Sequence, residues 1–361
     1  MREAVADRRR RILAAVQARG AVKVSDLAAE LEVSIVTARR DVEELAREGS
    51  IRRGHGVARS LVPRRAPAAS SSSPGAVALL VPERHAYLHE VVHGARTALE
   101  QARIRVVLHV VPHASGAERP IVERLDAEEV RGVLIAPRWR SAADEDEYRW
   151  LAQVRLPAVL MERRPPRDSP LHALDSVCSD HFHGMRLAVD HLIGLGHRRI
   201  LLAARADSPT ARAIRGAFAE LVAARPELEE CPVAVSAHDA DPDGLAAGQD
   251  FDPGWPARAL RENRATAAIL HGDVDALMLV QQLAEAGVRV PEDCSVVAYD
   301  DVVAAMGATP LTAVAPPKAE VGRVAAELLR RRLDNPDERW AQRVELLPRL
   351  VVRGSTRVLI D

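Results

Sequence analysis

The chain has 361 residues, of which 47% are hydrophobic and 28% charged, and a formal net charge of −1. This length exceeds one average domain, and the composition is that of an ordinary globular protein, which excludes a disordered or fibrous chain. No stretch of about 18 apolar residues could span a membrane, and the three widely spaced cysteines fit neither a disulfide framework nor a zinc cluster. We therefore expect a cytoplasmic protein with no membrane span, no bound metal and no cofactor.

Charge is distributed unevenly along the chain. Residues 1–65 carry 15 Arg or Lys against 9 Asp or Glu, whereas the remainder carries 35 against 42. A basic end is typical of a protein with a polyanionic partner, although arginine-rich ends are often only a solvated surface. The spacing of the basic residues decides between these interpretations.

The first 30 residues predict two short helices. Ile12, Leu13 and Val16 form an apolar stripe on the first, and Leu27 and Leu31 form one on the second. Ser25 is the expected N-cap of the second helix.

A third helix is expected after Ser34, a natural N-cap. Its inward face repeats at helical spacing through Ala38, Val42 and Leu45. The residues left largely facing outward are Thr37, Arg39, Arg40 and Asp41. After Gly49, the runs "SIRR" and "VARSL" predict two strands around the turn Gly54-His55-Gly56.

A helix, a short turn and a capped helix with outward basic residues form the arrangement that places a helix N-terminal half in the DNA major groove. Arginine pairs bidentately with guanine or holds phosphate, and the wing arginines add phosphate contacts. A solvated basic helix, or a winged helix that docks on protein, is the alternative interpretation.

The run Ser-x-x-Thr-x-Arg-Arg-Asp from Ser34 to Asp41, with its Gly-basic-His-Gly turn, resembles the winged helix-turn-helix of DeoR-type bacterial regulators over residues 8–58. Val57 departs from that pattern, because the family usually repeats glycine there. The DNA-contacting residues that we predict are Ser34, Thr37, Arg39, Arg40, Arg52, Arg53 and His55.

Residues 60–75, "SLVPRRAPAASSSSPG", cannot build a packed element and are expected to be a linker. We therefore predict a DNA-binding domain at 1–59, the linker at 60–75 and a large domain at 76–361.

The large domain alternates short apolar strands with helices. Strand-like runs are "AVALLV", "RVVLHVV", "GVLIA", "AVLM", "RILLAA", "AAIL" and "SVVAY", and the helical stretches are 88–103, 183–194, 209–224, 274–286 and 318–333. Fully apolar strands between helices predict an α/β fold with parallel sheets covered on both faces, and the length suggests two sheets.

Charged and polar residues follow these strands directly, where open α/β sheets bind ligands. The segments concerned are Pro82 to Tyr87, Arg138, Glu162-Arg163, Arg205 to Arg212, Gly272-Asp273 and Asp300-Asp301. Any one of these residues could equally be a helix cap or a surface charge. Their recurrence at one topological position favours a pocket for a polar ligand.

Three segments of the large domain resemble the effector domain of lactose-repressor-type (LacI/GalR) regulators, and so a periplasmic-binding-protein-like fold. They are "DHLIGLGHRRILLAA" at 190–204, "AEAGVRVPEDCSVVAYDD" at 284–301 and "TPLTAVAPPKAEVGRVAAELL" at 309–329. The resemblance implies two lobes joined by three crossovers, a ligand cleft and a homodimer. We place the N-lobe at about 76–173 plus 302–333, and the C-lobe at about 174–301 plus 334–361.

On this resemblance, Asp300 would hold ligand hydroxyls, and Arg212 or Arg215 would match the family's cleft arginine. The effector-binding residues that we predict are Tyr87, Leu88, Glu162, Arg212, Trp255, Asp273 and Asp300. Two of these positions depart from the family pattern: Glu162 stands where the family usually has Asp, and Gly272-Asp273 where it commonly has Asn-Asp. The identity of the ligand is therefore not implied.

Enzymatic motifs are missing: there is no Gly-rich phosphate loop, no Gly-x-Ser-x-Gly elbow and no His-Glu-x-x-His, so we expect no enzymatic activity. His85, His89 and His93 have metal-ligand spacing on one helix face, but a polar helix face is the favoured interpretation.

The sequence thus predicts a regulator, most simply a repressor, that binds double-stranded operator DNA and responds to a small polar effector such as a sugar. Two alternatives remain open: a DNA-binding regulator whose large domain is a ligand-free dimerisation module, and a cytosolic ligand-binding protein whose winged helix docks on protein.

Overall fold

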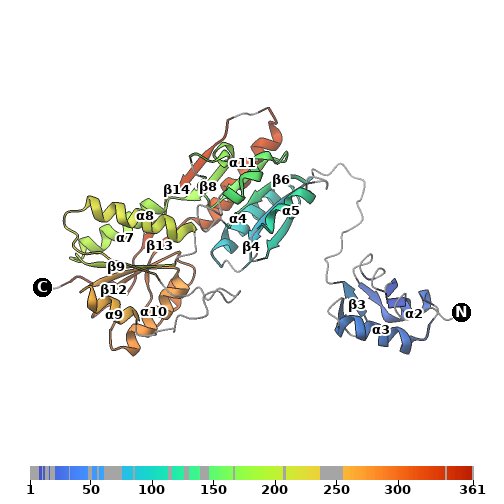
Figure 1. Ribbon diagram of the computed structural model, residues 1–361, viewed down its shortest axis with the longest axis horizontal. Helices are drawn as coiled ribbons and strands as arrows, with labels where there is room; N and C mark the ends of the chain where they lie inside the picture. The colour runs from blue at the N-terminus through green and yellow to red at the C-terminus, as the bar shows by residue number, and fades with distance from the viewer. Residues whose placement is uncertain are drawn as a thin grey trace. The chain divides into compact units, whose positions relative to one another are not determined.

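The computed structural model describes a large part of the chain. The described residues are 8–9, 11–12, 16, 21–31, 33–47, 51–54, 57–60, 75–83, 86–112, 116–125, 130–138, 146–165, 167–205, 209–235, 255–337 and 340–359. The chain divides into two compact units, Met1–Ser73 and Pro74–Asp361. Figure 1 draws both units, which are considered separately below.

The first unit combines helices with a small antiparallel sheet. Its elements are β1 (Ala21–Lys23), α2 (Val24–Glu30), α3 (Ile35–Arg47), β2 (Ile51–Gly54) and β3 (Val57–Ser60). Strand β3 pairs with both β1 and β2. The hairpin was predicted, whereas β1 was not.

The core of this unit is built from the predicted apolar stripes, including Ile12, Val16, Leu27 and Leu31. The predicted cap of the second helix is wrong: α2 begins at Val24, with Lys23 as its N-cap, and the Ser25 hydroxyl donates to the neighbouring Asp26 carboxylate.

The second unit contains two six-stranded sheets, which confirms the predicted α/β class. The N-lobe sheet has the order β14-β8-β7-β6-β4-β5, and the C-lobe sheet has the order β10-β9-β11-β12-β13-β15. All pairings within them are parallel except that of β13 with β15.

The N-lobe elements are β4 (Ala76–Pro82), α4 (Ala86–Gln101), β5 (Val106–Val111), α5 (Glu118–Leu125), β6 (Val130–Ile135), η1 (Arg149–Gln153), β7 (Ala158–Met161), η2 (Pro170–Ala173), β8 (Asp175–Ser179), α11 (Lys318–Asp334) and β14 (Arg343–Leu346). The C-lobe elements are α7 (His181–Gly194), β9 (Ile200–Ala204), α8 (Pro209–Ala224), β10 (Val233–Val235), α9 (Trp255–Glu262), β11 (Ala267–His271), α10 (Asp273–Glu285), β12 (Ser295–Tyr299), η3 (Ala304–Met306), β13 (Thr312–Ala315) and β15 (Arg349–Val351). The predicted strands and helices are all present. Helices α5 and α9 and strands β8, β10, β13, β14 and β15 were not predicted.

The inner strands β4, β9, β11 and β12 are buried on both faces, which explains why their sequences are uninterrupted apolar runs. Along β4, Val77 and Leu79 join the core beside α4 and α11, whereas Ala78 and Leu80 join the core on the opposite face. In the C-lobe, α7 and α8 cover one face of the sheet, and α9 and α10 cover the other (Figure 1).

The helices α4 and α11 pack closely because glycine stands at both contact points. A Cβ atom on Gly322 would lie 1.9 Å from the carbonyl oxygen of Val91, and one on Gly94 would lie 2.0 Å from that of Ala319. Neither position has room for a side chain.

The predicted lobe boundaries, N-lobe 76–173 plus 302–333 and C-lobe 174–301 plus 334–361, need correction. Strand β8 pairs with β7 and β14 in the N-lobe, and β13 pairs with β12 in the C-lobe. The chain therefore changes lobe after Ser179, after Ala315 and after Leu346. Apolar patterning cannot fix these points, because strands of both lobes are equally buried.

Within the described ranges, no helix is long and apolar enough to cross a membrane.

Candidate functional site

Helix α3 begins as predicted. The Ser34 hydroxyl accepts a 3.1 Å hydrogen bond from the backbone N–H of Thr37 and lies 2.8 Å from the Thr37 hydroxyl, so that Ser34 caps the helix. The inward face is buried through Ala38, Val42 and Leu45. This fixes which side of the helix faces solvent.

Asp41 does not face outward, which corrects the sequence prediction. Its side chain is only 4% exposed, and its carboxylate accepts hydrogen bonds from Nε of Arg8 at 2.7 Å and Nε of Arg9 at 3.1 Å. The acidic member of the Arg-Arg-Asp run therefore ties α3 to the preceding basic segment.

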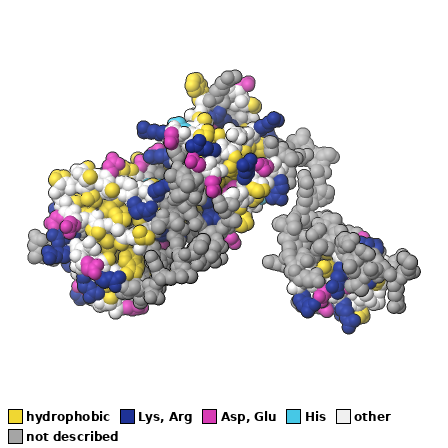
Figure 2. All heavy atoms as spheres, viewed as in Figure 1, with side chains coloured by type: hydrophobic (Ala, Val, Ile, Leu, Met, Phe, Trp, Pro, Cys, Tyr) yellow, Lys and Arg dark blue, Asp and Glu magenta, His cyan; other side chains and the backbone are white. Residues whose placement is uncertain are grey.

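The outward face of α3 carries basic and apolar residues together. Arg39 and Arg40 are exposed, as predicted. Ile35 and Val36 are 52% and 74% exposed, and sequence reasoning missed them because apolar residues were assigned to the core. Figure 2 shows Lys and Arg side chains gathered over α3 in the described part of this unit.

Arg52 and Arg53 lie on β2, opposite Arg59 and Ala58 of β3. His55 lies outside the described residues. The predicted wing thus has the expected strands, and the contacts predicted for these three side chains remain predictions.

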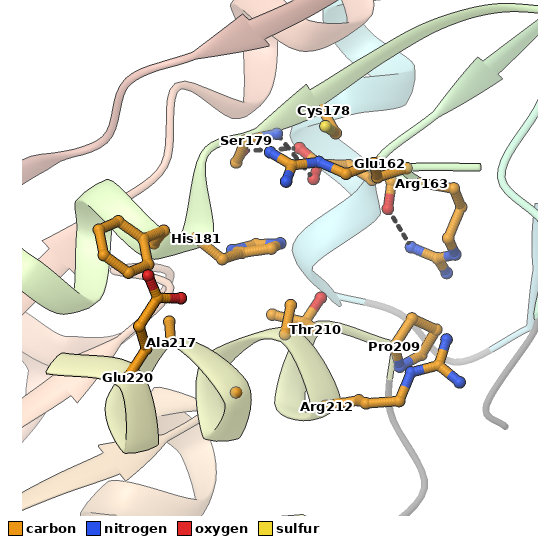
Figure 3. Close-up of a pocket in the computed structure, with 14 residues that line it drawn as sticks. Glu162, Arg163, Cys178, Ser179, His181, Pro209, Thr210, Arg212, Ala217 and Glu220 are labelled. Carbon is orange, nitrogen blue, oxygen red and sulfur yellow. Dashed lines mark hydrogen bonds between the residues drawn. The ribbon is translucent and has the colours of Figure 1, made fainter. Parts of the chain in front are cut away.

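The second unit contains a cavity of about 390 Å³ at the junction of its lobes. The N-lobe contributes residues that follow β7 or end β8, and the C-lobe contributes the start of α7 and one side of α8 (Figure 3). The cavity therefore lies at carboxyl ends of parallel strands, as the topological rule requires.

Glu162 stands on the N-lobe side of this cavity in a left-handed backbone conformation (φ 54°). Its carboxylate accepts hydrogen bonds from the Tyr87 hydroxyl at 2.9 Å, the Ser179 hydroxyl at 2.9 Å and the Ser179 N–H at 3.3 Å. Burial raises the pKa of Glu162 above its usual value, while these donors oppose the rise. Burial, with the nearby Glu162 and Asp300, also raises the pKa of Tyr87, so Tyr87 acts as a hydrogen-bond donor.

Arginine side chains line the cavity on both sides. Arg163 is buried and donates to the carbonyl oxygens of Pro137 and Glu162. On the opposite side, α8 presents Arg212, together with Thr210 and Glu220 (Figure 3). Of the two candidate arginines, Arg212 lines the cavity, whereas Arg215 donates to the Arg205 carbonyl.

His181 and Cys178 also line the cavity, and both are uncharged at neutral pH. Burial, aided by Arg163, lowers the pKa of His181 to about 4, and its Nδ1 lies 3.1 Å from the Tyr299 hydroxyl. Burial raises the pKa of the Cys178 thiol to about 12, so it is not a reactive thiolate.

Asp300 follows β12 with a positive φ of 106°. Its Oδ1 atom is buried and has no hydrogen-bond partner among the described residues. Burial and the neighbouring Asp273 carboxylate raise the pKa of Asp300 well above its usual value, although Lys318 opposes the rise. An unpaired buried acceptor is unfavourable unless a ligand completes its hydrogen bonding.

Lys318, at the start of α11, is a residue that sequence reasoning missed. It is 4% exposed, and its Nζ donates to the Asp300 carbonyl oxygen at 2.5 Å and lies 3.6 Å from Oε1 of Glu90. The same atom lies 5.6 Å from the centroid of the Tyr87 ring. The sequence held one signal that could have identified it: a lysine directly after Pro317, at the start of a helix whose other inward residues are mostly apolar.

Three predicted effector-binding residues do not line this cavity. Leu88 is 3% exposed and belongs to the N-lobe core. Asp273 accepts hydrogen bonds from the N–H groups of residues 302–304, so it secures the loop after β12. Trp255 packs against the apolar core beside α9 and α10.

Tyr87 and Asp300 also stand outside the cavity lining, although Tyr87 bonds to Glu162. Glu162 and Arg212 are the predicted residues that the cavity brings together. Among the described residues no group of three or more His, Cys, Asp or Glu could hold a metal ion, and His85 lies outside them.

Comparison with known families finds one match in each unit. Residues 8–64 match the DeoR-like helix-turn-helix domain, and residues 189–356 match the periplasmic binding protein-like domain.

Two curated relatives illustrate the similarity. The chain is 32% identical over 215 residues to the HTH-type transcriptional repressor PurR of Haemophilus influenzae (strain PittEE), covering 57% of this chain and 59% of the relative. It is 26% identical over 272 residues to the arabinose metabolism transcriptional repressor of Geobacillus stearothermophilus, covering 74% and 72%. The match to the first relative thus spans about three fifths of that protein's length.

Solved structures share the fold. A lac repressor dimer bound to operator and the anti-inducer ONPF has a TM-score of 0.65 at 22% identity, covering 80% of this chain and 96% of that one. A complex of the transcriptional regulator CelR with cellobiose has a TM-score of 0.62 at 24% identity, covering 90% and 91%. A ribose-bound LacI family regulator from Enterococcus faecium has a TM-score of 0.60 at 23% identity, covering 79% and 100%. The chain therefore carries a match to the DeoR-like helix-turn-helix domain in its first unit and a match to the periplasmic binding protein-like domain in its second.

Proposed function

We propose that this protein is a transcriptional repressor that acts in the cytoplasm and binds operator DNA through α3 and the β2–β3 wing. The outward arginines Arg39 and Arg40 on a capped helix support DNA as the partner. The relatives described above are named as transcriptional repressors, which agrees with a regulatory role and not an enzymatic one.

We propose that the cavity between the lobes binds a small polar effector, in particular a sugar. The observation that carries this proposal is the cavity of about 390 Å³ bounded by Glu162, Ser179, Thr210 and Arg212. Alternating carboxylate, hydroxyl and guanidinium groups match the hydroxyls of a sugar. Two of the structural relatives are described with bound ribose and cellobiose.

The effector acts by favouring one arrangement of the lobes, because a ligand shifts an equilibrium only through its different affinities for two states. Lys318 and Asp300 stand where the lobes meet and couple the cleft to α11.

We propose a homodimer built along the second unit. Exposed apolar side chains recur on the edge strand β5, at Leu108 and Val110, and on α10, at Val274 and Met278. Apolar side chains exposed on an edge strand favour a partner surface. A symmetric dimer would present two copies of α3 to two operator half-sites.

The experiment is a pair of titrations on the full-length protein. Operator binding, followed by fluorescence anisotropy, is expected to weaken steeply with salt and in Arg39→Ala and Arg40→Ala. Thermal melting in the presence of mono- and disaccharides, sugar phosphates and nucleosides identifies the effector. A ligand at about 100 times its Kd adds roughly 2.7 kcal/mol to the free energy of unfolding of the unit that binds it.

These titrations separate the alternatives. If the affinity for DNA changes neither with salt nor with the arginine substitutions, a winged helix that docks on protein is favoured. If no ligand raises the melting temperature while DNA binding is intact, a large domain that serves as a ligand-free dimerisation module is favoured.

A further inference from the structure

The outward face of α3 exposes two branched apolar side chains. Ile35 is 52% exposed and Val36 is 74% exposed. Branched residues are weaker helix formers than Ala, Glu or Lys. Apolar side chains that stay in contact with water also make little hydrophobic contribution to folding. These two residues therefore contribute little to the stability of α3 itself.

The position of Val36 on the helix places it between two basic residues. At 3.6 residues per turn, Val36 lies between Arg39 and Arg40 around the axis, on the side opposite the buried Ala38 and Leu45. The first turn of this surface is thus apolar, and the second is cationic.

Acidic groups are kept away from the start of this surface. Asp41 is turned into the core and paired with Arg8 and Arg9. Glu43, which is exposed, lies on the same side about two turns after Val36. The N-terminal half of the outward face is therefore complementary to a polyanion.

The hydroxyl groups at the start of α3 are already engaged. Those of Ser34 and Thr37 lie 2.8 Å apart, and the Ser34 oxygen also accepts the Thr37 N–H. The groups left to meet a partner at the first turn are Ile35 and Val36. In the DNA major groove, the apolar group on a base edge is the C5-methyl of thymine.

We propose that Val36, with Ile35 beside it, contacts thymine methyl groups in the major groove and so helps to select the operator sequence. This inference rests on the proposed function. Arg39 and Arg40 hold the flanking phosphates or a guanine, and the two apolar residues distinguish thymine from a base without a methyl group.

The test first selects a binding sequence from a random duplex library with the full-length protein. Each thymine of one half-site is then replaced by deoxyuridine, which removes only the methyl group. At the thymine that Val36 contacts, affinity is expected to fall about fourfold, the equivalent of one buried methyl.

Variants assign the effect to the side chain. In Val36→Ala, the affinities for thymine and deoxyuridine duplexes are expected to become equal at that position, with Ile35→Ala giving a smaller change. Val352→Ala, an equally conservative change at an exposed valine of the second unit, should retain the fourfold ratio.

Two results would overturn the inference while leaving DNA binding intact. One is a selected operator at which no deoxyuridine substitution changes affinity, and the other is a thymine preference that survives in both Val36→Ala and Ile35→Ala. A library from which no duplex is enriched would instead refute the proposed function, and this inference with it.

Discussion

The Nζ atom of Lys318 donates a hydrogen bond of 2.5 Å to the carbonyl oxygen of Asp300. Lys318 begins α11 in the N-lobe, and Asp300 follows β12 in the C-lobe, so this bond joins the two lobes. The lysine also approaches Glu90 and the Tyr87 ring, both from α4. A buried ammonium group is thus shared between the lobes close to Glu162, the hydrogen-bond partner of Tyr87.

Replacing Lys318 by Met should destabilise the second unit. The substitution keeps most of the volume but leaves the partly buried Asp300 carbonyl without its lysine donor, which costs about 1–3 kcal/mol. Urea denaturation at pH 7 measures the loss. Lys23→Met, at an exposed lysine of the first unit, is the control and should leave the transition of the second unit unchanged. An identical midpoint in Lys318→Met would show that the lysine bond is dispensable.

The stability that Glu162 and Asp300 contribute to the second unit should fall as pH rises above about 4.5, the ordinary pKa of a glutamate. Burial raises the pKa of both Glu162 and Asp300, so the folded protein binds their protons more tightly than the unfolded chain does. Such groups contribute their full stability below the unfolded pKa, and the contribution is lost as pH rises through the folded value. Denaturation of the wild type, Glu162→Gln and Asp300→Asn is measured at a series of pH values above this point. In each variant the free energy of unfolding should fall less with rising pH than it does in the wild type.

The matched control for this pH dependence is Glu123→Gln, an exposed carboxyl on α5. It should follow the wild-type curve. If Glu162→Gln and Asp300→Asn also follow that curve, the burial of these carboxyls is not what sets the pH dependence.

Asp41→Asn should weaken the first unit. It removes the charge that receives two arginine N–H donors, one of them from the Arg8 guanidinium, which is only 12% exposed. The expected loss is about 1–3 kcal/mol. Far-UV circular dichroism of the full chain should show earlier melting of this unit. Glu44→Gln, in a more exposed pair with Arg47, should change stability by less than about 1 kcal/mol. Equal melting of the two variants would contradict the role assigned to Asp41.

Gly322→Ala should destabilise the N-lobe by about 1–3 kcal/mol or more, because the new Cβ would meet the backbone of α4 and force α11 away. The comparison variant is Gly194→Ala in α7, where an added Cβ has no neighbour within 4 Å. A thermal midpoint of Gly322→Ala equal to that of Gly194→Ala would mean that the two helices separate at little energetic cost.

Local sequence signals predicted a few residues of the candidate sites. Ser34 was predicted as the helix cap because a hydroxyl before an amphipathic run is a local feature. Glu162 and Arg212 were placed at the cleft from their positions relative to strands and from family resemblance, and the cavity brings them together. Leu88 and Asp273 were misplaced, because a residue near a strand end can face the core or a loop as readily as a ligand.

The two-unit organisation, the α/β alternation and the basic capped helix could be predicted from the sequence, since each depends on spacing along a short stretch of chain. The tertiary fold was needed to show which strands share a sheet, that Asp41 turns inward to Arg8, and that Lys318 contacts Asp300. These relationships join residues far apart in sequence, and the energetic cost of burying a charge or a strand edge selects among partners that no local pattern distinguishes.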